Sequence, residues 1–175
     1  MQKIPTLFQR DPATNMRTLT HDIHPDCQWV LNGEGRATRK LDGTCAMIRD
    51  GQLYKRREVK KGKPEPEGFE LVAEDANTGK RVGWIAVGDG PEDKYFREAM
   101  DGGFNDGTFE LVGPKVQGNP EGFTVHTLVA HGAYDIPGVP RDYDGLAEFL
   151  STFPHEGIVW HHPDGHMAKI KCRDF

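Results

Sequence analysis

Three short motifs place amines and a carboxylate on or beside predicted strands. They are Lys40-Leu41-Asp42-Gly43, Glu156-Gly157-Ile158-Val159 and Lys169-Ile170-Lys171. An uncharged lysine amine can act as a nucleophile, a charged one can hold an anionic group such as phosphate, and a carboxylate suits Mg²⁺. Each motif alone is also typical of an ordinary protein surface, because a lysine before an Asp-Gly turn and a strand with two lysines on its outer face are common.

The order of the three motifs is more informative than any one of them. A short predicted hairpin joins the last two, and the first lies well upstream. This arrangement resembles motifs I, IV and V of the covalent nucleotidyltransferases, which include polynucleotide ligases and mRNA capping enzymes. The resemblance extends from about residue 34 to residue 171.

Longer segments resemble a family of small one-domain RNA ligases in particular. These segments are 33–45, 54–62, 83–87 and 108–120, and the last, TFELVGPKVQGNP, is the most specific marker. The resemblance implies an adenylation domain of the nucleotidyltransferase type, ATP-grasp-like in fold. It also implies an ATP-dependent enzyme that seals 5′-phosphate and 3′-hydroxyl ends of broken or nicked RNA.

The resemblance assigns the chemistry to four residues. Lys40 is the expected nucleophile, which attacks the α-phosphorus of ATP, carries AMP and passes it to the RNA 5′ end. The attacking amine must be uncharged, and desolvation and neighbouring cations favour that form. Lys169 and Lys171 are expected to supply the cations and to hold the α-phosphate, while Glu156 is expected to be linked to Mg²⁺ or Mn²⁺.

Other residues are expected to bind the nucleotide. Glu110 is expected to contact the ribose or a metal-bound water, and Gly43 permits a tight turn after the nucleophile. Trp84 and Phe109 are candidates for stacking on the base, with core packing as the alternative. The full set of expected nucleotide contacts is Thr38, Asp42, Gly43, Arg57, Trp84, Phe109 and Glu110.

The sequence departs from the family pattern at Cys45. The family usually has an arginine two residues after the glycine of motif I, and a cysteine cannot replace it as a phosphate ligand. Arg56 or Arg57 in the next predicted strand can take over. Adjacent strand residues point to opposite faces, so only one of them is expected to face the site, and Arg57 is favoured.

A local basic run follows the first motif, although the chain as a whole has a net charge of −5. Its members expected to bind RNA are Lys55, Arg56, Lys60 and Lys61. Proteins that follow nucleic acid over many phosphates are usually basic. The net negative charge therefore favours recognition of an RNA end or a nick over binding along a long strand. The sequence does not indicate the oligomeric state.

Cysteine and histidine positions give weaker indications. The odd number of cysteines, 3, and the absence of a CxxC pair favour a reducing, cytoplasmic setting, and no signal peptide or membrane span is expected. A zinc site can be imagined at His161, His162 and His166, but a hairpin surface is the better interpretation. His131 has no assigned role.

The secondary-structure pattern predicts an α+β domain dominated by antiparallel sheet. Strands are expected at 27–31, 37–41, 44–48, 53–57, 69–73, 84–87, 108–112, 124–130, 157–161 and 167–172, with helices at 91–100 and 144–153. The Asp50-Gly51 pair predicts a tight hairpin turn. Residues 1–175 are expected to form one adenylation domain without an OB-fold domain.

Three functions compete. The first is an ATP-dependent RNA ligase, and the second is a capping guanylyltransferase or a DNA ligase, both of which normally carry an OB-fold domain. The third is an inactive nucleotide- or RNA-binding relic, which predicts loss of a charged site residue. Lys40, Glu156, Lys169 and Lys171 are all present, so the first is favoured. The sequence does not distinguish ATP from GTP as the nucleotide substrate.

Overall fold

The K-x-D-G motif lies where the chain passes between two compact units of the computed structural model, which describes residues 1–76, 78–100 and 103–175. Unit 1 comprises Met1–Lys3 and Asp42–His131, and unit 2 comprises Ile4–Leu41 and Gly132–Phe175. Lys40 therefore belongs to unit 2, and Asp42 and Gly43 belong to unit 1. The expectation of one adenylation domain over residues 1–175 stays a prediction.

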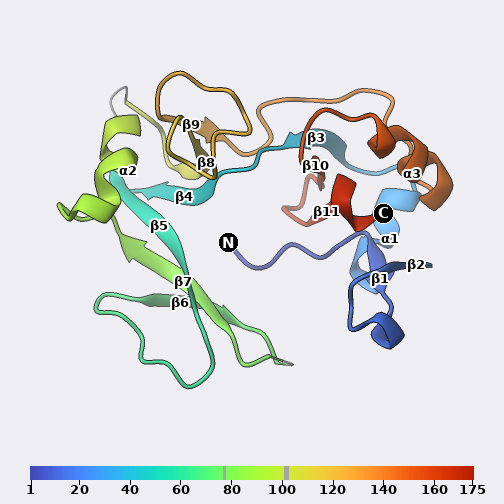
Figure 1. Ribbon diagram of the computed structural model, residues 1–175, viewed down its shortest axis with the longest axis horizontal. Coiled ribbons are helices and arrows are strands. Elements are labelled where there is room, and N and C mark those ends of the chain that lie inside the picture. The colour runs from blue at the N-terminus through green and yellow to red at the C-terminus, as the bar shows by residue number, and fades with distance from the viewer. Residues whose placement is uncertain (77, 101–102) are drawn as a thin grey trace. The chain divides into compact units, whose positions relative to one another are not determined.

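Unit 1 is built on an antiparallel sheet of six strands in the order β6-β7-β5-β4-β8-β9 (Figure 1). Their bounds are β4 Thr44–Arg49, β5 Gln52–Val59, β6 Glu70–Glu74, β7 Arg81–Ala86, β8 Gly107–Val112 and β9 Thr127–Ala130. The predicted hairpin is confirmed, because Asp50 and Gly51 have φ of 52° and 74° between β4 and β5. Two positive φ values suit the right-handed twist of the flanking strands.

The two faces of this sheet differ in chemistry. One face buries Ala46, Ile48 and Leu111 against helix α2 (Lys94–Ala99), which follows a 3₁₀ turn at Pro91–Asp93. Residues opposite each other in an antiparallel pair share a face. Cys45 pairs with Glu110, so both lie on the other face, away from this core.

Unit 2 contains a three-stranded antiparallel sheet in the order β11-β10-β3 and a separate two-stranded sheet. The strands are β1 Phe8–Arg10, β2 Leu19–Ile23, β3 Arg36–Lys40, β10 Gly157–His161 and β11 Met167–Lys171. The helices are α1 Gln28–Leu31 and α3 Tyr143–Ser151, with 3₁₀ turns at Pro12–Thr14, Pro25–Cys27 and Cys172–Asp174.

The core of unit 2 lies on one face of its three-stranded sheet. Leu146 and Leu150 of α3 pack with Ile158, Trp160 and Ile170, all of them buried. The predicted helix over 144–153 is confirmed with slightly different bounds. Strand alternation sends the residues between these core positions, including the lysines of β3 and β11, to the opposite face.

The strand predicted at 27–31 is wrong. Cys27 ends a 3₁₀ turn that begins at Pro25, and the next four residues form α1. Cys27 and Val30, three residues apart, are both buried, whereas Leu31 is exposed. A short apolar run is compatible with either strand or helix, and here a spacing of three places the apolar side chains on one helical face.

The structure agrees with the predicted class, since it mixes helices with sheets whose strands pair antiparallel. Within the part of the chain that the structure describes, every helix is too short or too polar to cross a membrane.

Candidate active site

Strand pairing in unit 2 places one residue from each of the three sequence motifs side by side across the sheet. Gly157 at the start of β10 lies opposite Lys40 on one side and Lys171 on the other. A Cβ atom on Gly157 would approach Ile170 O to 2.1 Å, so only glycine fits between the two lysine-bearing strands. The preceding residue is Glu156, and its carboxylate therefore reaches both lysines.

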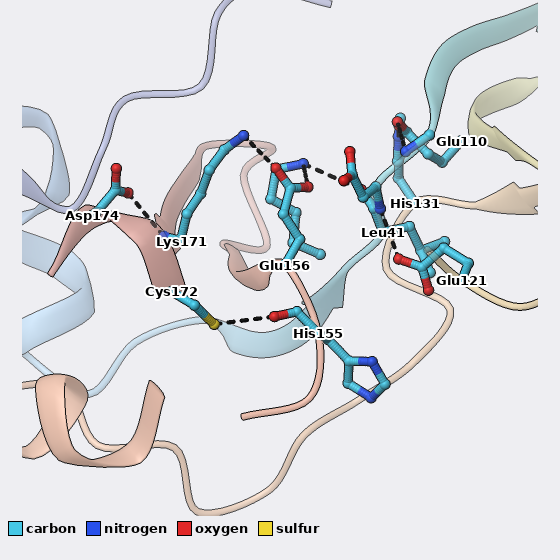
Figure 2. Close-up of polar contacts among 12 residues, drawn as sticks. Leu41, Glu110, Glu121, His131, His155, Glu156, Lys171, Cys172 and Asp174 are labelled. Carbon is cyan, nitrogen blue, oxygen red and sulfur yellow. Dashed lines mark hydrogen bonds and ion pairs between the residues drawn. The ribbon is translucent and has the colours of Figure 1, made fainter. Parts of the chain in front are cut away.

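The Glu156 carboxylate bridges the two ammonium groups (Figure 2). Lys40 Nζ donates to Glu156 Oε2 at 2.5 Å, and Lys171 Nζ donates to Glu156 Oε1. Lys40 Nζ also donates to the carbonyl oxygen of Leu41 at 3.2 Å. The Lys40, Glu156 and Lys171 side chains are only 19%, 12% and 17% exposed, so the three charges interact with limited screening by water.

The lysines keep Glu156 ionised in spite of its burial. Burial alone raises the pKa of a carboxyl group, because it disfavours the charged form. For Glu156 this effect is outweighed by hydrogen bonds from Lys171 and Lys40 and by their positive charges, and the pKa is lowered from its ordinary value of 4.5. The site therefore contains a carboxylate and two lysines at neutral pH.

The next row of the same face contains Thr38 and Lys169, which both pair with Val159. Lys169 thus lies two residues from Lys171 on one strand face, as predicted from alternation. Thr38 is buried, and its hydroxyl donates to Val159 O at 3.1 Å while contacting His161 Nε2 at 3.0 Å. The predicted role of Thr38 at the base edge stays a prediction.

In unit 1, two carboxylates hold the backbone at Asp42 and Gly43, just after Lys40 in the sequence. The Asp42 N–H donates to Glu121 Oε1 at 2.8 Å, and the Gly43 N–H donates to Glu110 Oε1 at 3.1 Å. A Cβ atom on Gly43 would lie 2.2 Å from Leu111 O, so this glycine allows the loop to approach β8. Close approach, rather than a positive φ, explains the glycine.

The other oxygen of Glu110 contacts His131. Glu110 Oε2 lies 3.0 Å from His131 Nε2, and His131 Nδ1 lies 2.9 Å from the Thr108 hydroxyl. Figure 2 shows the Glu110, His131 and Glu121 side chains. Glu121 and His131 were not among the expected site residues, and neither lies in a recognisable motif that would have indicated it.

The two candidate arginines lie on opposite faces of β5. Arg56 pairs with Trp84, and the register between β4 and β5 places Arg56 on the face of Cys45 and Glu110. Arg57, which the sequence favoured, is exposed and points to the other face. The Nε atom of Arg56 is buried, and no described residue accepts a hydrogen bond from it. This geometry favours Arg56 over Arg57 as the replacement for the family arginine.

The two aromatic candidates also differ in their surroundings. Phe109 belongs to the core of unit 1, where its ring packs edge-on against Phe104 at 5.5 Å between centroids. Trp84 is 4% exposed and lies on the face of Arg56. Core packing thus accounts for Phe109, and the stacking roles of both residues stay predictions.

The residues of the basic run differ in their exposure and in their partners. Lys55 Nζ lies 2.5 Å from Asp93 Oδ1, and the Asp93 side chain is 3% exposed and also accepts from the Gly88 N–H at 2.8 Å. Lys55 is therefore part of the attachment of the α2 segment to the sheet. Lys60 and Lys61 are exposed after the end of β5, where they are accessible to a ligand.

Comparison with known proteins points to one enzyme family. Residues 100–175 match the family model of RNA ligase 1. RNA ligase 1 of Pongo abelii and of Danio rerio are each 38% identical to this chain over 72 residues, which cover 36% of this chain and 22% of the relative. Over this region the chain is similar to RNA ligase 1. The resemblance inferred from the sequence is confirmed over this part of the chain.

The extent of the match matters for the site. The chain spans about a fifth of the length of the curated relatives that it matches. The matched residues 100–175 include Glu110, Glu156, Lys169 and Lys171, whereas Lys40 lies outside them. Lys40 is connected to this RNA ligase region by the pairing of β3 with β10 and by the ion pair with Glu156.

The shifted pKa of Glu156 predicts a pH-dependent contribution to stability. Because that pKa is lower in the folded than in the unfolded chain, the ion pairs stabilise the fold above pH 4.5 and lose this effect as the pH falls through the folded value. We expect Glu156→Gln to lower the free energy of unfolding by about 1–3 kcal/mol at pH 7. Urea denaturation at pH 7 and at pH 3 measures the difference.

The expected difference between wild type and Glu156→Gln becomes smaller as the pH falls from 7 toward 3, because Glu156 itself becomes protonated as the pH passes through its folded pKa. Glu148→Gln, an exposed position on α3, is the matched control and should change little at either pH. An equal loss for Glu156→Gln at both pH values would contradict an electrostatic role.

The close approach of Gly43 to β8 predicts that even a methyl group is not tolerated. Gly43→Ala should destabilise unit 1 by about 1–3 kcal/mol, because the methyl group overlaps Leu111 O and displaces the loop from Glu110. Gly107→Ala is the control, since its nearest neighbour is a Phe109 ring atom at 3.6 Å. Urea denaturation compares the two variants, and equal midpoints would show that the loop relaxes without cost.

Proposed function

We propose that this chain is the adenylation region of an ATP-dependent RNA ligase, with Lys40 as the nucleophile that becomes attached to AMP. The observation that carries this proposal is the meeting of Lys40 and Lys171 on one partly buried carboxylate, that of Glu156. The match of residues 100–175 to RNA ligase 1 supports RNA as the substrate. The proposed fold is the adenylation-domain fold of the covalent nucleotidyltransferases.

The reaction begins with the Lys40 amine. Its nitrogen attacks the α-phosphorus of ATP, a P–N bond forms, the bond to the β-phosphate oxygen breaks, and pyrophosphate leaves. The 5′-phosphate of RNA then attacks the same phosphorus and releases the lysine. Finally the 3′-hydroxyl attacks the 5′-phosphorus and displaces AMP. Each step transfers a phosphoryl group, so positioning and charge neutralisation supply most of the catalysis.

Glu156 controls the state of the nucleophile. An ammonium group paired with a carboxylate has no free electron pair, so Lys40 must separate from Glu156 and lose a proton before it attacks. Lys171 remains beside it as a cation, and a neighbouring cation favours the uncharged amine. Lys169 and Lys171 hold phosphate oxygens on the same strand face, and binding of those oxygens offsets the loss of the Glu156 pair.

The residues present also suit a divalent cation. Mg²⁺ prefers oxygen ligands and keeps several of its waters, so an ionised carboxylate such as Glu156 is an adequate protein ligand. When bound there, Mg²⁺ or Mn²⁺ would neutralise negative charge on the phosphates. Glu156 would hold such a cation through the carboxylate that otherwise pairs with Lys40.

The first experiment is covalent labelling with α-labelled ATP or GTP in the presence of Mg²⁺, followed by a denaturing gel. We expect a labelled band with ATP that disappears in Lys40→Arg, a variant that retains a positive charge for Glu156 but removes the nucleophile. Lys60→Ala, at an exposed position, should label normally.

Labelling with GTP but not with ATP would instead indicate a capping guanylyltransferase. No label with either nucleotide, from folded protein free of bound AMP, would overturn the lysyl-AMP mechanism. Such a result would favour a nucleotide- or RNA-binding protein without catalysis.

The face preference of β5 predicts which arginine assists this reaction. Arg56→Ala should lower the rate of lysine labelling at least about tenfold, whereas Arg57→Ala should retain it, because charged hydrogen bonds to phosphate contribute roughly 1.5–3 kcal/mol. Single-turnover labelling with the two variants side by side measures this. A larger loss in Arg57→Ala would reverse the assignment.

A further inference from the structure

Three chemically distinct ligand groups meet on the non-core face of unit 1. They are the Cys45 thiol of β4, the Glu110 carboxylate of β8 and the His131 imidazole just after β9. Their ligand atoms all lie within 4.8 Å of one another. Cys45 is directly opposite Glu110 in the β4–β8 pairing, so backbone hydrogen bonds fix the positions of these two residues.

The combination of ligands indicates the class of metal. Mg²⁺ takes oxygen ligands, whereas a thiolate and an imidazole suit Zn²⁺ and chemically similar cations. Bond lengths of about 2.0–2.3 Å place ligand atoms around a tetrahedral zinc roughly 3.5 Å apart. Glu110 Oε2 and His131 Nε2 are 3.0 Å apart, and the Cys45 thiol lies within 4.8 Å of both, so the three ligand atoms are near the spacing that a shared cation requires.

The surroundings can support these three residues as ligands. His131 Nδ1 lies 2.9 Å from the Thr108 hydroxyl, which can accept a hydrogen bond from Nδ1–H and so leave Nε2 as the metal ligand. A ligating histidine usually donates its other N–H in this way. Glu110 binds the Gly43 N–H through Oε1, and its Oε2 is thus available to a cation without loss of that contact.

We propose that Cys45, Glu110 and His131 form a binding site for a thiophilic divalent cation, Zn²⁺ in the first place. Three protein ligands leave a fourth position for water or another ligand, the pattern of open zinc sites. The cation replaces the hydrogen bond between His131 and Glu110 with two coordinate bonds. It also fixes the carboxylate that holds the Gly43 backbone, three residues after Lys40.

A second group of possible ligands makes the weaker candidate. His162, Asp164 and His166 come together at the turn between β10 and β11, but Asp164 and His166 are exposed and no thiol is among them. Exposed histidines and carboxylates commonly lie together without a metal. This group is therefore a useful internal control rather than a rival site.

Titration with Co²⁺ tests the proposal on the purified chain, reduced with a phosphine and kept free of nucleotide and Mg²⁺. We expect a thiolate-to-cobalt charge-transfer band and the strong visible bands of tetrahedral cobalt, both abolished by Zn²⁺ in competition. Cys45→Ser should remove the charge-transfer band, and His131→Ala should weaken Zn²⁺ affinity at least about tenfold. The readout needs no ligase activity, so it is independent of the proposed function.

Matched variants give the test its specificity. Cys172→Ser and His162→Ala remove a thiol and an imidazole elsewhere and should leave the spectrum unchanged, with circular dichroism as the check on folding. X-ray absorption of the zinc-loaded wild type, which needs no variant, should show one sulfur ligand. A charge-transfer band that survives in folded Cys45→Ser, or a zinc shell of nitrogen and oxygen alone, would overturn the site.

Discussion

The proposed chemistry of this chain depends on the contact between Glu156 and the two lysines. One carboxylate accepts from Lys40 and Lys171, which come from strands on opposite sides of β10. Two ammonium groups at such a distance repel each other, and the carboxylate between them makes the arrangement stable in the resting protein. Glu156 also occupies Lys40, the proposed nucleophile, by accepting its hydrogen bond. Glu156 thus stabilises the fold of the site and holds in place the lysines that are proposed to bind phosphate.

The main sheet of each unit has one face on a hydrophobic core, and its opposite face carries the side chains of the candidate site. In unit 2 the core residues Ile158 and Ile170 alternate with the lysine-bearing positions. In unit 1, Ala46 and Leu111 face the core, while Cys45 and Glu110 face away from it. Strand alternation therefore sets the composition of both polar faces, and a slip of one residue in register would bury the charges and expose the core.

Much of this organisation was predictable from the sequence, because period-two patterns and the Asp50-Gly51 turn are local signals. The shared face of Lys169 and Lys171 followed from the same periodicity. The choice between Arg56 and Arg57 did not, because it depends on the pairing of β5 with β4 and of β4 with β8, which no local pattern contains. The wrong strand at 27–31 has a similar origin, since its short apolar run suits two structures and tertiary packing selected the helix.

Cys45 shows how a departure from a family pattern acquires meaning from long-range pairing. In the sequence it is a missing arginine, and taken alone it suggests a degraded site. The β4–β8 register places it opposite Glu110, and the end of β9 adds His131, which no motif had indicated. The family arginine serves phosphate, whereas a thiol beside an imidazole and a carboxylate serves a soft cation. Arg56 lies on the same face and carries a positive charge, so one sheet face offers both an arginine for the proposed phosphate contact and a thiol for the proposed cation site.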